Sequence, residues 1–267
     1  MTTFQALVLG LIQGVTEFLP ISSSAHLALA PWFFGWPDPG LAFDVALHFG
    51  TLIAVLWYFR AEWGKLISAA LSIIRNRRIQ TVEEKRLLFL IVATIPGAIG
   101  GLLLEKKAET AFRAPALTAC ALIVMGIVLW AADRFSRMDR NITGMRWLDA
   151  LLVGISQVFA LIPGVSRSGS TITTGRLLRL DRESAAIFSF LMSMPIIAAA
   201  VVLKGPEALR QGGLSAPLIV GVLAAAVSGW LAIAILMRYV TRHSYGIFAV
   251  YRVLLGIVVL FIIYSRG

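Results

Sequence analysis

Two short segments hold most of the residues whose types could perform chemistry. The first combines an acid, hydroxyls and an imidazole within ten residues: Glu17, Ser22, Ser23, Ser24 and His26. A serine beside a histidine can form a nucleophile and its base, and a carboxylate can hold a divalent cation. The serines could instead cap a helix that follows Pro20. Glu17, however, lies next to Phe18 and Leu19, and an ionisable group in apolar surroundings indicates function by default.

The second segment offers a fixed positive charge among hydroxyls and flexible backbone: Ser166, Arg167, Ser168, Gly169, Ser170 and Thr171. If a helix begins near Ser168, its free N–H groups form an anion site, which the forked donors of Arg167 would strengthen. An arginine that merely reaches the membrane surface would not explain why Arg167 lies between apolar flanks. The ligand that these donors predict is a phosphate.

Together the two segments contain the parts of a phosphoryl-transfer site, in which a cation and an arginine stabilise the charge on the phosphate. Oxygen ligands predominate, since the chain has one cysteine and three histidines. This favours Mg²⁺ or Ca²⁺ over Zn²⁺. Cys120 lies in an apolar run, and as the single cysteine it excludes a disulfide within the chain.

The composition indicates a membrane environment for these segments. Of the 267 residues, 58% are hydrophobic and only 14% are charged, and the mean hydropathy is +0.84. A soluble domain carries roughly 25% charged residues. Long apolar runs alternate with short basic connectors, so the net charge of +10 is better explained by membrane topology than by nucleic-acid binding.

Six segments are apolar and long enough to cross roughly 30 Å of hydrocarbon: 43–59, 87–104, 115–132, 184–203, 215–237 and 246–264. Two more, 4–34 and 147–179, are apolar at both ends and broken in the middle by proline and polar residues. Irregular backbone at membrane depth is tolerated only within protein or beside a water-filled cavity. We therefore predict an all-α polytopic membrane protein with six transmembrane helices and two re-entrant helical hairpins.

The two broken segments also resemble each other. In one, Gly10-Leu-Ile-Gln13 precedes a proline and a serine cluster, and in the other Gly154-Ile-Ser-Gln157 does the same. Each is followed by three predicted spans, and an odd number inverts the second half relative to the first. This predicts one membrane domain over 1–267 built as an inverted repeat, with halves at about 1–135 and 145–267.

The basic residues predict the orientation. Connectors 60–86, 133–183 and 238–245 hold 17 Lys and Arg, whereas 105–114, 204–214 and the C-terminal tail hold 6. By the positive-inside rule the first group is cytoplasmic, so both termini face outward.

Two longer motifs carry a family resemblance. The segments Gln13-Gly-Val-Thr-Glu17-Phe-Leu-Pro-Ile-Ser-Ser-Ser-Ala-His26 and Pro163-Gly-Val-Ser-Arg-Ser-Gly-Ser-Thr171 resemble the two signatures of the undecaprenyl-pyrophosphate phosphatase family, of the bacitracin-resistance type. The length, the six spans and the motif order agree over essentially the whole chain. The resemblance implies hydrolysis of undecaprenyl pyrophosphate to undecaprenyl phosphate and inorganic phosphate, in a bacterial inner membrane. It further suggests a site that opens outward, toward the periplasm.

The same resemblance implies roles for individual residues. Glu17, Ser23, His26 and Arg167 would form the catalytic core, with Glu17 on the metal. The phosphate pocket would be lined by Gln13, Ser22, Ser24, Ser166, Ser168, Gly169, Ser170 and Thr171. Ser23 would attack the terminal phosphorus with His26 as its base; direct attack by His26, or by water without a covalent intermediate, stays open.

One departure concerns Gln13, where many family members have Glu. Gln13 lies one helical turn from Glu17 and so faces the same way. It can bind a cation or a phosphate through its amide but brings no charge, so the metal or base role shifts to Glu17.

Two other functions compete with this prediction. A membrane carrier or flippase for a phosphorylated lipid or anion would also use paired broken helices, but it needs no nucleophile beside a base. A phosphatase of the phosphatidic-acid type would need two separated histidine motifs, which His26, His48 and His243 do not supply.

Some features stay undecided at this level. Asp44 and His48, one turn apart, are either partners of the site or interfacial caps, and we expect a structural partner for Arg252. Bilayer lipid is an expected partner, and a homodimer is left open.

Overall fold

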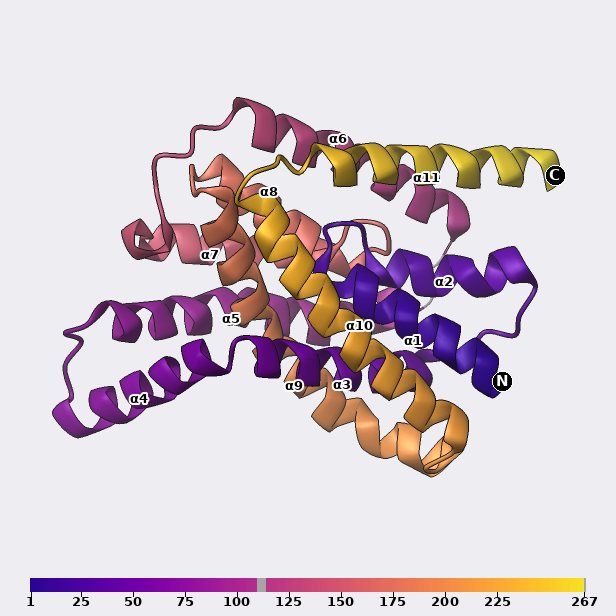
Figure 1. The fold of residues 1–267 in the computed structure, drawn as a ribbon, viewed down its shortest axis with the longest axis horizontal. Helices are drawn as coiled ribbons and strands as arrows, with labels where there is room; N and C mark the ends of the chain where they lie inside the picture. Colours follow the sequence, from indigo (N-terminus) through magenta and orange to yellow (C-terminus); the bar gives the residue numbers. More distant parts are fainter. Residues whose placement is uncertain (110–113, 267) are drawn as a thin grey trace.

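The computed structural model describes residues 1–109 and 114–266. Over these ranges the chain forms eleven α-helices and two short 3₁₀ helices, and its β structure is limited to a single bridge between Arg140 and Leu180. The all-helical prediction is therefore confirmed for the described residues (Figure 1).

The first part of the chain contains α1 (Thr3–Phe18), α2 (Ser23–Phe34), α3 (Leu41–Tyr58), α4 (Arg60–Asn76), α5 (Val82–Glu109) and α6 (Pro115–Phe135). The second part contains η2 (Ile142–Gly144), α7 (Trp147–Ser156), η3 (Gln157–Leu161), α8 (Arg167–Leu177), α9 (Arg182–Gly212), α10 (Ala216–Val240) and α11 (Gly246–Arg266).

The long helices have the length and composition of membrane spans. Five of them, α5, α6, α9, α10 and α11, are each long and apolar enough to cross a bilayer. Helices α3 and α4 pass the same test only as a pair, which bends by 81°. The chain is therefore a multi-pass membrane protein, and its described residues contain five candidate spans, or six if the bent pair counts as one.

Helix α4 was not predicted, because its residues lie in a connector that the sequence assigned to the cytoplasmic loops. Ile67, Leu71 and Ile74 on this helix are exposed, while Lys65 and Glu62 pair with each other. Helix α4 is thus amphipathic, with an apolar face that is largely exposed.

Each broken segment turns at its proline. Helix α1 ends at Phe18, Leu19 is extended before Pro20, and α2 begins after Ser22, because the residue before a proline disfavours helical geometry. In the second segment η3 ends at Leu161, Pro163 follows, and α8 begins after Ser166. The predicted breaks are confirmed at both places.

Small residues allow the first helix of each broken segment to lie directly against a long helix. A Cβ on Gly10 of α1 would stand 2.3 Å from the carbonyl oxygen of Gly221 in α10, and one on Gly154 of α7 would stand 2.4 Å from that of Ala93 in α5. Only glycine allows the two backbones to approach this closely, which is typical of packed membrane helices. These contacts fix α1 on α10 and α7 on α5.

The two ends of the molecule differ. The chain termini lie at one end of the long axis in Figure 1, and the α4–α5 turn and the α6–α7 connection lie at the other. The connectors richest in basic residues are therefore gathered at the end opposite to the termini.

At the basic end, one carboxylate joins four helices. Asp133 of α6 accepts hydrogen bonds from Arg176 Nε of α8 at 2.9 Å, Arg182 Nε of α9 at 2.8 Å and the backbone N–H of Tyr245, just before α11, at 3.0 Å. Arg176 is fully buried. Removing one partner of a buried ion pair leaves the other charge uncompensated.

We predict that Asp133→Ala destabilises the protein by about 3–5 kcal/mol, since Arg176 would keep its charge without a carboxylate. Thermal unfolding of the purified protein in detergent measures this. The matched control is Asp139→Ala, whose partner Arg179 is exposed and whose loss should leave the melting temperature nearly unchanged. Equal melting temperatures for the Asp133 variant and the parent would contradict this role.

Candidate active site

The centre of the site is a buried carboxylate shared between the two broken segments. Glu17, in the last turn of α1, is 6% exposed. Its Oε2 accepts hydrogen bonds from Ser23 Oγ at 2.5 Å and Gln13 Nε2 at 3.0 Å, and His48 Nε2 lies 3.6 Å from the same oxygen. Its Oε1 accepts a bond from Arg167 Nη2 at 2.5 Å.

Arg167 reaches this carboxylate from the first residue of α8. Its Nη1 donates to the carbonyl oxygen of Ser193 in α9 at 3.2 Å, so the guanidinium is held at two points. Burying either charge alone would cost several kcal/mol, whereas the pair with its added hydrogen bonds is tolerated. The ion pair therefore ties residues 150 positions apart into one site.

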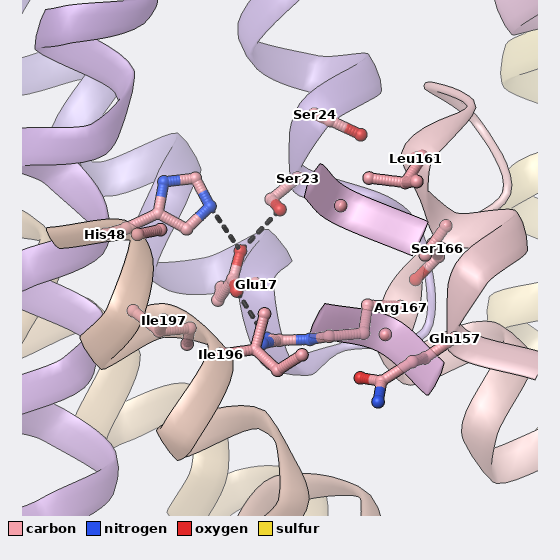
Figure 2. Close-up of a pocket in the computed structure, with 14 residues that line it drawn as sticks. Glu17, Ser23, Ser24, His48, Gln157, Leu161, Ser166, Arg167, Ile196 and Ile197 are labelled. Atoms are coloured by element: carbon pink, nitrogen blue, oxygen red, sulfur yellow. Dashed lines mark hydrogen bonds and ion pairs between the residues drawn. The ribbon is translucent and has the colours of Figure 1, made fainter. Parts of the chain in front are cut away.

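A pocket of about 250 Å³ opens beside this pair (Figure 2). Its polar lining comes from both broken segments and α3: Glu17, Ser23, Ser24, His48, Gln157, Ser166 and Arg167. Small and aliphatic residues of α5, η3 and α9 complete the wall. A carboxylate, three serine hydroxyls, an imidazole and a guanidinium thus face one small cavity.

The two loops that carry these groups are built alike. Ser22 and Ser166 both have positive φ, at 77° and 72°. Each caps the helix that follows, accepting the N–H of Ala25 and Gly169 respectively. The loops also touch, because the N–H of Gly164 donates to Ser22 Oγ at 3.1 Å. Ser23 and Arg167 are consequently the first residues of two helices whose N-termini meet at the pocket.

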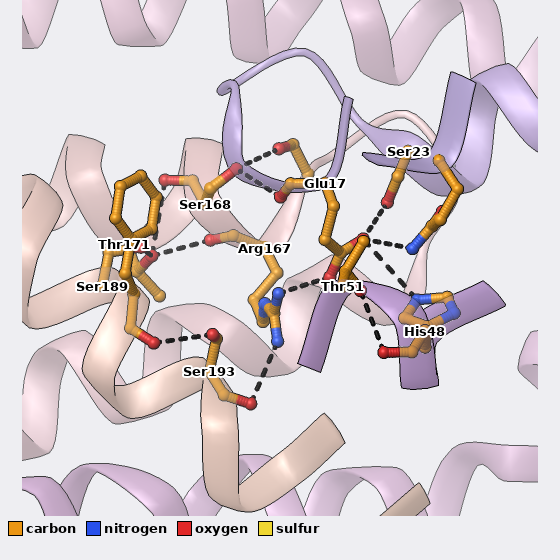
Figure 3. A network of polar contacts seen from close by, with 12 residues as sticks. Glu17, Ser23, His48, Thr51, Arg167, Ser168, Thr171, Ser189 and Ser193 are labelled. Atoms are coloured by element: carbon orange, nitrogen blue, oxygen red, sulfur yellow. Dashed lines mark hydrogen bonds and ion pairs between the residues drawn. The ribbon is translucent and has the colours of Figure 1, made fainter. Parts of the chain in front are cut away.

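The hydroxyl groups of Ser168 and Thr171, behind Arg167, hydrogen-bond to other parts of the protein and do not line the pocket (Figure 3). Ser168 Oγ donates to the carbonyl oxygen of Leu19 at 3.0 Å. Thr171 Oγ1 donates to that of Arg167 at 2.7 Å and meets Ser189 Oγ at 2.7 Å. These bonds join α8 to the first loop and to α9.

Comparison with known proteins shows which family the chain belongs to. The family profile described as "Bacitracin resistance protein BacA" matches residues 6–258. The undecaprenyl-diphosphatases of Gemmatimonas aurantiaca and Moorella thermoacetica are 64% and 54% identical to the chain over 266 residues, covering 100% of both chains in each case. That of Geobacter sulfurreducens is 47% identical over 275 residues, again over 100% of both chains. This chain belongs to the BacA family.

Of the predicted catalytic residues of this BacA-family chain, His26 is the one that lies apart from the pocket. Its Nδ1 is 2.7 Å from the carbonyl oxygen of Ser22 and its Nε2 is 2.7 Å from the hydroxyl of Tyr251, on whose ring it stacks. Both ring nitrogens are occupied, and Ser23 donates to Glu17 instead. The predicted Ser23–His26 pair is therefore not formed.

The predicted phosphate-binding residues divide into two groups. Ser24 and Ser166 line the pocket, whereas Gln13, Ser22, Ser168, Gly169, Ser170 and Thr171 do not. Gln13 supports Glu17 from behind, and Ser170 donates to the carbonyl oxygen of Arg167 within its own helix. These six residues lie outside the lining of the pocket, and their binding of substrate stays a prediction.

Two lining residues were not assigned to the site from the sequence. The sequence leaves the role of His48 undecided, and the structure places it at the carboxylate because α3 packs beside the first loop (Figure 2). In the sequence, Gln157 stands out only as the counterpart of Gln13. Its Nε2 donates to the carbonyl oxygen of Ala93 at 2.7 Å, while its buried Oε1 has no hydrogen-bond partner.

We predict that His48→Ala lowers the turnover number by about tenfold or more, because Glu17 loses the imidazole beside the oxygen that accepts the Ser23 hydrogen bond. Phosphate release by the purified protein measures this. His243→Ala is the control, since His243 is exposed and stacks on Tyr239 away from the site. Full turnover in the His48 variant would remove that residue from the mechanism.

Proposed function

We propose that this chain is an undecaprenyl-diphosphatase, which hydrolyses undecaprenyl pyrophosphate to undecaprenyl phosphate and inorganic phosphate. The observation that carries the proposal is the hydrogen bond from Ser23 to a buried carboxylate that also pairs with Arg167. A hydroxyl beside a base and a guanidinium in one pocket are the parts of phosphoryl transfer. Relatives named for this activity match over their full length.

The pyrophosphate would bind where the N-termini of α2 and α8 meet. Free backbone N–H groups at both ends favour anions. Arg167 would exchange part of its contact with Glu17 for the phosphoryl oxygens, where its two donors can bind side by side. The Ser24 and Ser166 hydroxyls line the same cavity.

In the first chemical step, Ser23 Oγ attacks the terminal phosphorus and its proton passes to Glu17. The bond from that phosphorus to the bridging oxygen breaks. The polyprenyl phosphate leaves with the electron pair of this bond and with the proton that Glu17 had accepted from Ser23. Water then attacks the phosphoserine: Glu17 takes the proton of the water and delivers it to Ser23 Oγ as inorganic phosphate departs. Arg167 stabilises the charge that develops on the phosphoryl oxygens in both steps.

Glu17 takes the role of base that the sequence had given to His26. Attack by His26 itself would require its ring to leave the Ser22 carbonyl and the Tyr251 hydroxyl. Direct attack by water on the pyrophosphate remains an alternative that loss of the Ser23 hydroxyl distinguishes.

The site also fits a divalent cation that enters with the substrate. Among the described residues no three His, Cys, Asp or Glu side chains gather around one point. Glu17 and the buried, unpaired Oε1 of Gln13 beside it are hard oxygen ligands that suit Mg²⁺ or Ca²⁺, with the pyrophosphate supplying the others. Such an ion would neutralise phosphate charge.

We further propose that the fold is an inverted repeat of two halves, about 1–135 and 145–267, with the broken segments as re-entrant hairpins. The matching Ser22 and Ser166 caps support this. So does reciprocal packing of α6 and α11: a Cβ on Gly126 would meet Ala249 and Val253, and one on Gly256 would meet Ala119 and Ile123. Such exchange is expected about a two-fold axis.

The proposed setting is the bacterial inner membrane. The basic connectors at the end opposite to the termini favour a cytoplasmic location for that end. A site that opens toward the periplasm would serve recycling of the cell-wall lipid carrier, and hence bacitracin resistance.

We predict that the purified protein releases inorganic phosphate from a polyprenyl pyrophosphate with Mg²⁺ or Ca²⁺, and that EDTA reduces the rate.

Ser23→Ala should lose at least about 10²-fold in turnover number, whereas Ser265→Ala, which changes an exposed serine of α11, should retain the parental turnover number. A parent protein that releases no phosphate across detergents, lipids and cations, but moves the lipid between leaflets, would favour a carrier instead.

We also predict that Arg167→Lys lowers the turnover number by about 10²-fold, since an ammonium cannot donate to Glu17, Ser193 and a phosphoryl group with forked geometry. The same assay measures this, with Arg179→Lys, an exposed arginine, as the control. Near-normal turnover in Arg167→Lys would take the guanidinium out of the transition state.

A further inference from the structure

A second arginine lies inside the bundle, and the mechanism above does not use it. Arg252, in the first half of α11, is fully buried. Its hydrogen bonds within the described chain all go to backbone carbonyl oxygens and none to a carboxylate. Burying a charge costs free energy unless hydrogen bonds satisfy it, and here backbone carbonyl groups supply those hydrogen bonds.

The carbonyl groups that it binds belong to both broken segments. Arg252 Nη1 donates to Pro20 at 2.9 Å, and Nη2 donates to Gly164 at 2.6 Å and Val165 at 2.9 Å. A weaker bond runs from Nε to Leu122 of α6 at 3.4 Å. One planar guanidinium thus bridges the two loops directly.

The carbonyl groups that bind Arg252 lie one or two residues before the residues of the site with positive φ. Pro20 is two residues before Ser22, and Val165 is one residue before Ser166, the two serines with positive φ. Non-glycine residues keep such backbone geometry only where the surroundings enforce it. The residues that follow them, Ser23 and Arg167, are the ones whose separation the reaction depends on.

Gly169 gives independent evidence that the guanidinium position matters. A Cβ on Gly169 would lie 2.6 Å from Arg252 Nη1 and 2.9 Å from Ser166 Cβ. Any larger residue at position 169 would displace the guanidinium or Ser166. The glycine of the serine-rich motif is therefore explained by the closeness of Arg252 and Ser166.

We propose that Arg252 is a positioning residue for phosphoryl transfer, which sets the distance between Ser23 and Arg167 by bridging the carbonyl groups of the two loops. The inference rests on the proposed function. It differs from a purely structural role in one measurable way: a misplaced pair of groups lowers the rate of the chemical step in molecules that remain folded and still bind substrate.

The test compares Arg252→Lys, which keeps the charge but not the fork, with Arg252→Met, which keeps neither. For each purified variant, the folded fraction at the assay temperature is measured by thermal unfolding, and kcat and KM are measured by phosphate release. Both variants should lose at least about tenfold in kcat per folded molecule, with KM within about threefold of the parent.

Two results would overturn the inference: kcat per folded molecule within threefold of the parent in both variants, or a rise in KM at unchanged kcat. If neither arginine variant folds, Gly169→Ala provides the test, because it leaves Arg252 in place while its methyl group would displace the guanidinium, 2.6 Å away, together with Ser166. It should lower kcat in the same way, while Gly64→Ala, a helical glycine with open space around it, should not. Parental kcat in Gly169→Ala would then refute the role.

The parent protein in the same assay separates the two claims. A parent without phosphate release defeats the proposed function. An active parent with equally active Arg252 variants defeats this inference alone.

Discussion

The ion pair between Glu17 and Arg167 is the interaction on which the arrangement of the molecule depends. Burying either charge without the other would cost several kcal/mol, and their residues lie 150 positions apart. The two broken segments must therefore meet, and the long helices must leave room for them. The close packing of α1 on α10 and of α7 on α5, through Gly10 and Gly154, holds the segments where the pair can form.

The parts of this structure that the sequence predicts are those with local causes. The breaks at Pro20 and Pro163 follow from backbone sterics, and the long helices follow from apolar runs. Helix α4 could not be predicted, because the charged residues of its connector fit a cytoplasmic loop as well as they fit an amphipathic helix. His48 escaped assignment for a different reason: its spacing from Asp44 is a local fact, while its 3.6 Å approach to Glu17 depends on how α3 packs.

The serine-rich motifs show a further limit of reading residues as a group. Once α8 begins at Arg167, successive side chains turn by about 100° around its axis. Arg167 faces the pocket, but Ser168 then reaches the first loop and Thr171 reaches Ser189. Residues that are adjacent in the sequence therefore point in different directions in the structure. Most of the hydroxyl groups of the cluster join α8 to neighbouring segments. His26 is a similar case, since α2 turns it toward Tyr251.

The two loops are alike in backbone and unlike in chemistry, and electrostatics accounts for the difference. Ser23 and Arg167 occupy the same position, the first residue after a serine cap. Two arginines meeting there would repel in a low dielectric, and two carboxylates would force one to take up a proton. A buried site between similar halves is therefore more stable if the charged groups of the two halves differ where they touch. In the mechanism proposed above, the same difference supplies a nucleophile with its base on one side and a stabilising cation on the other.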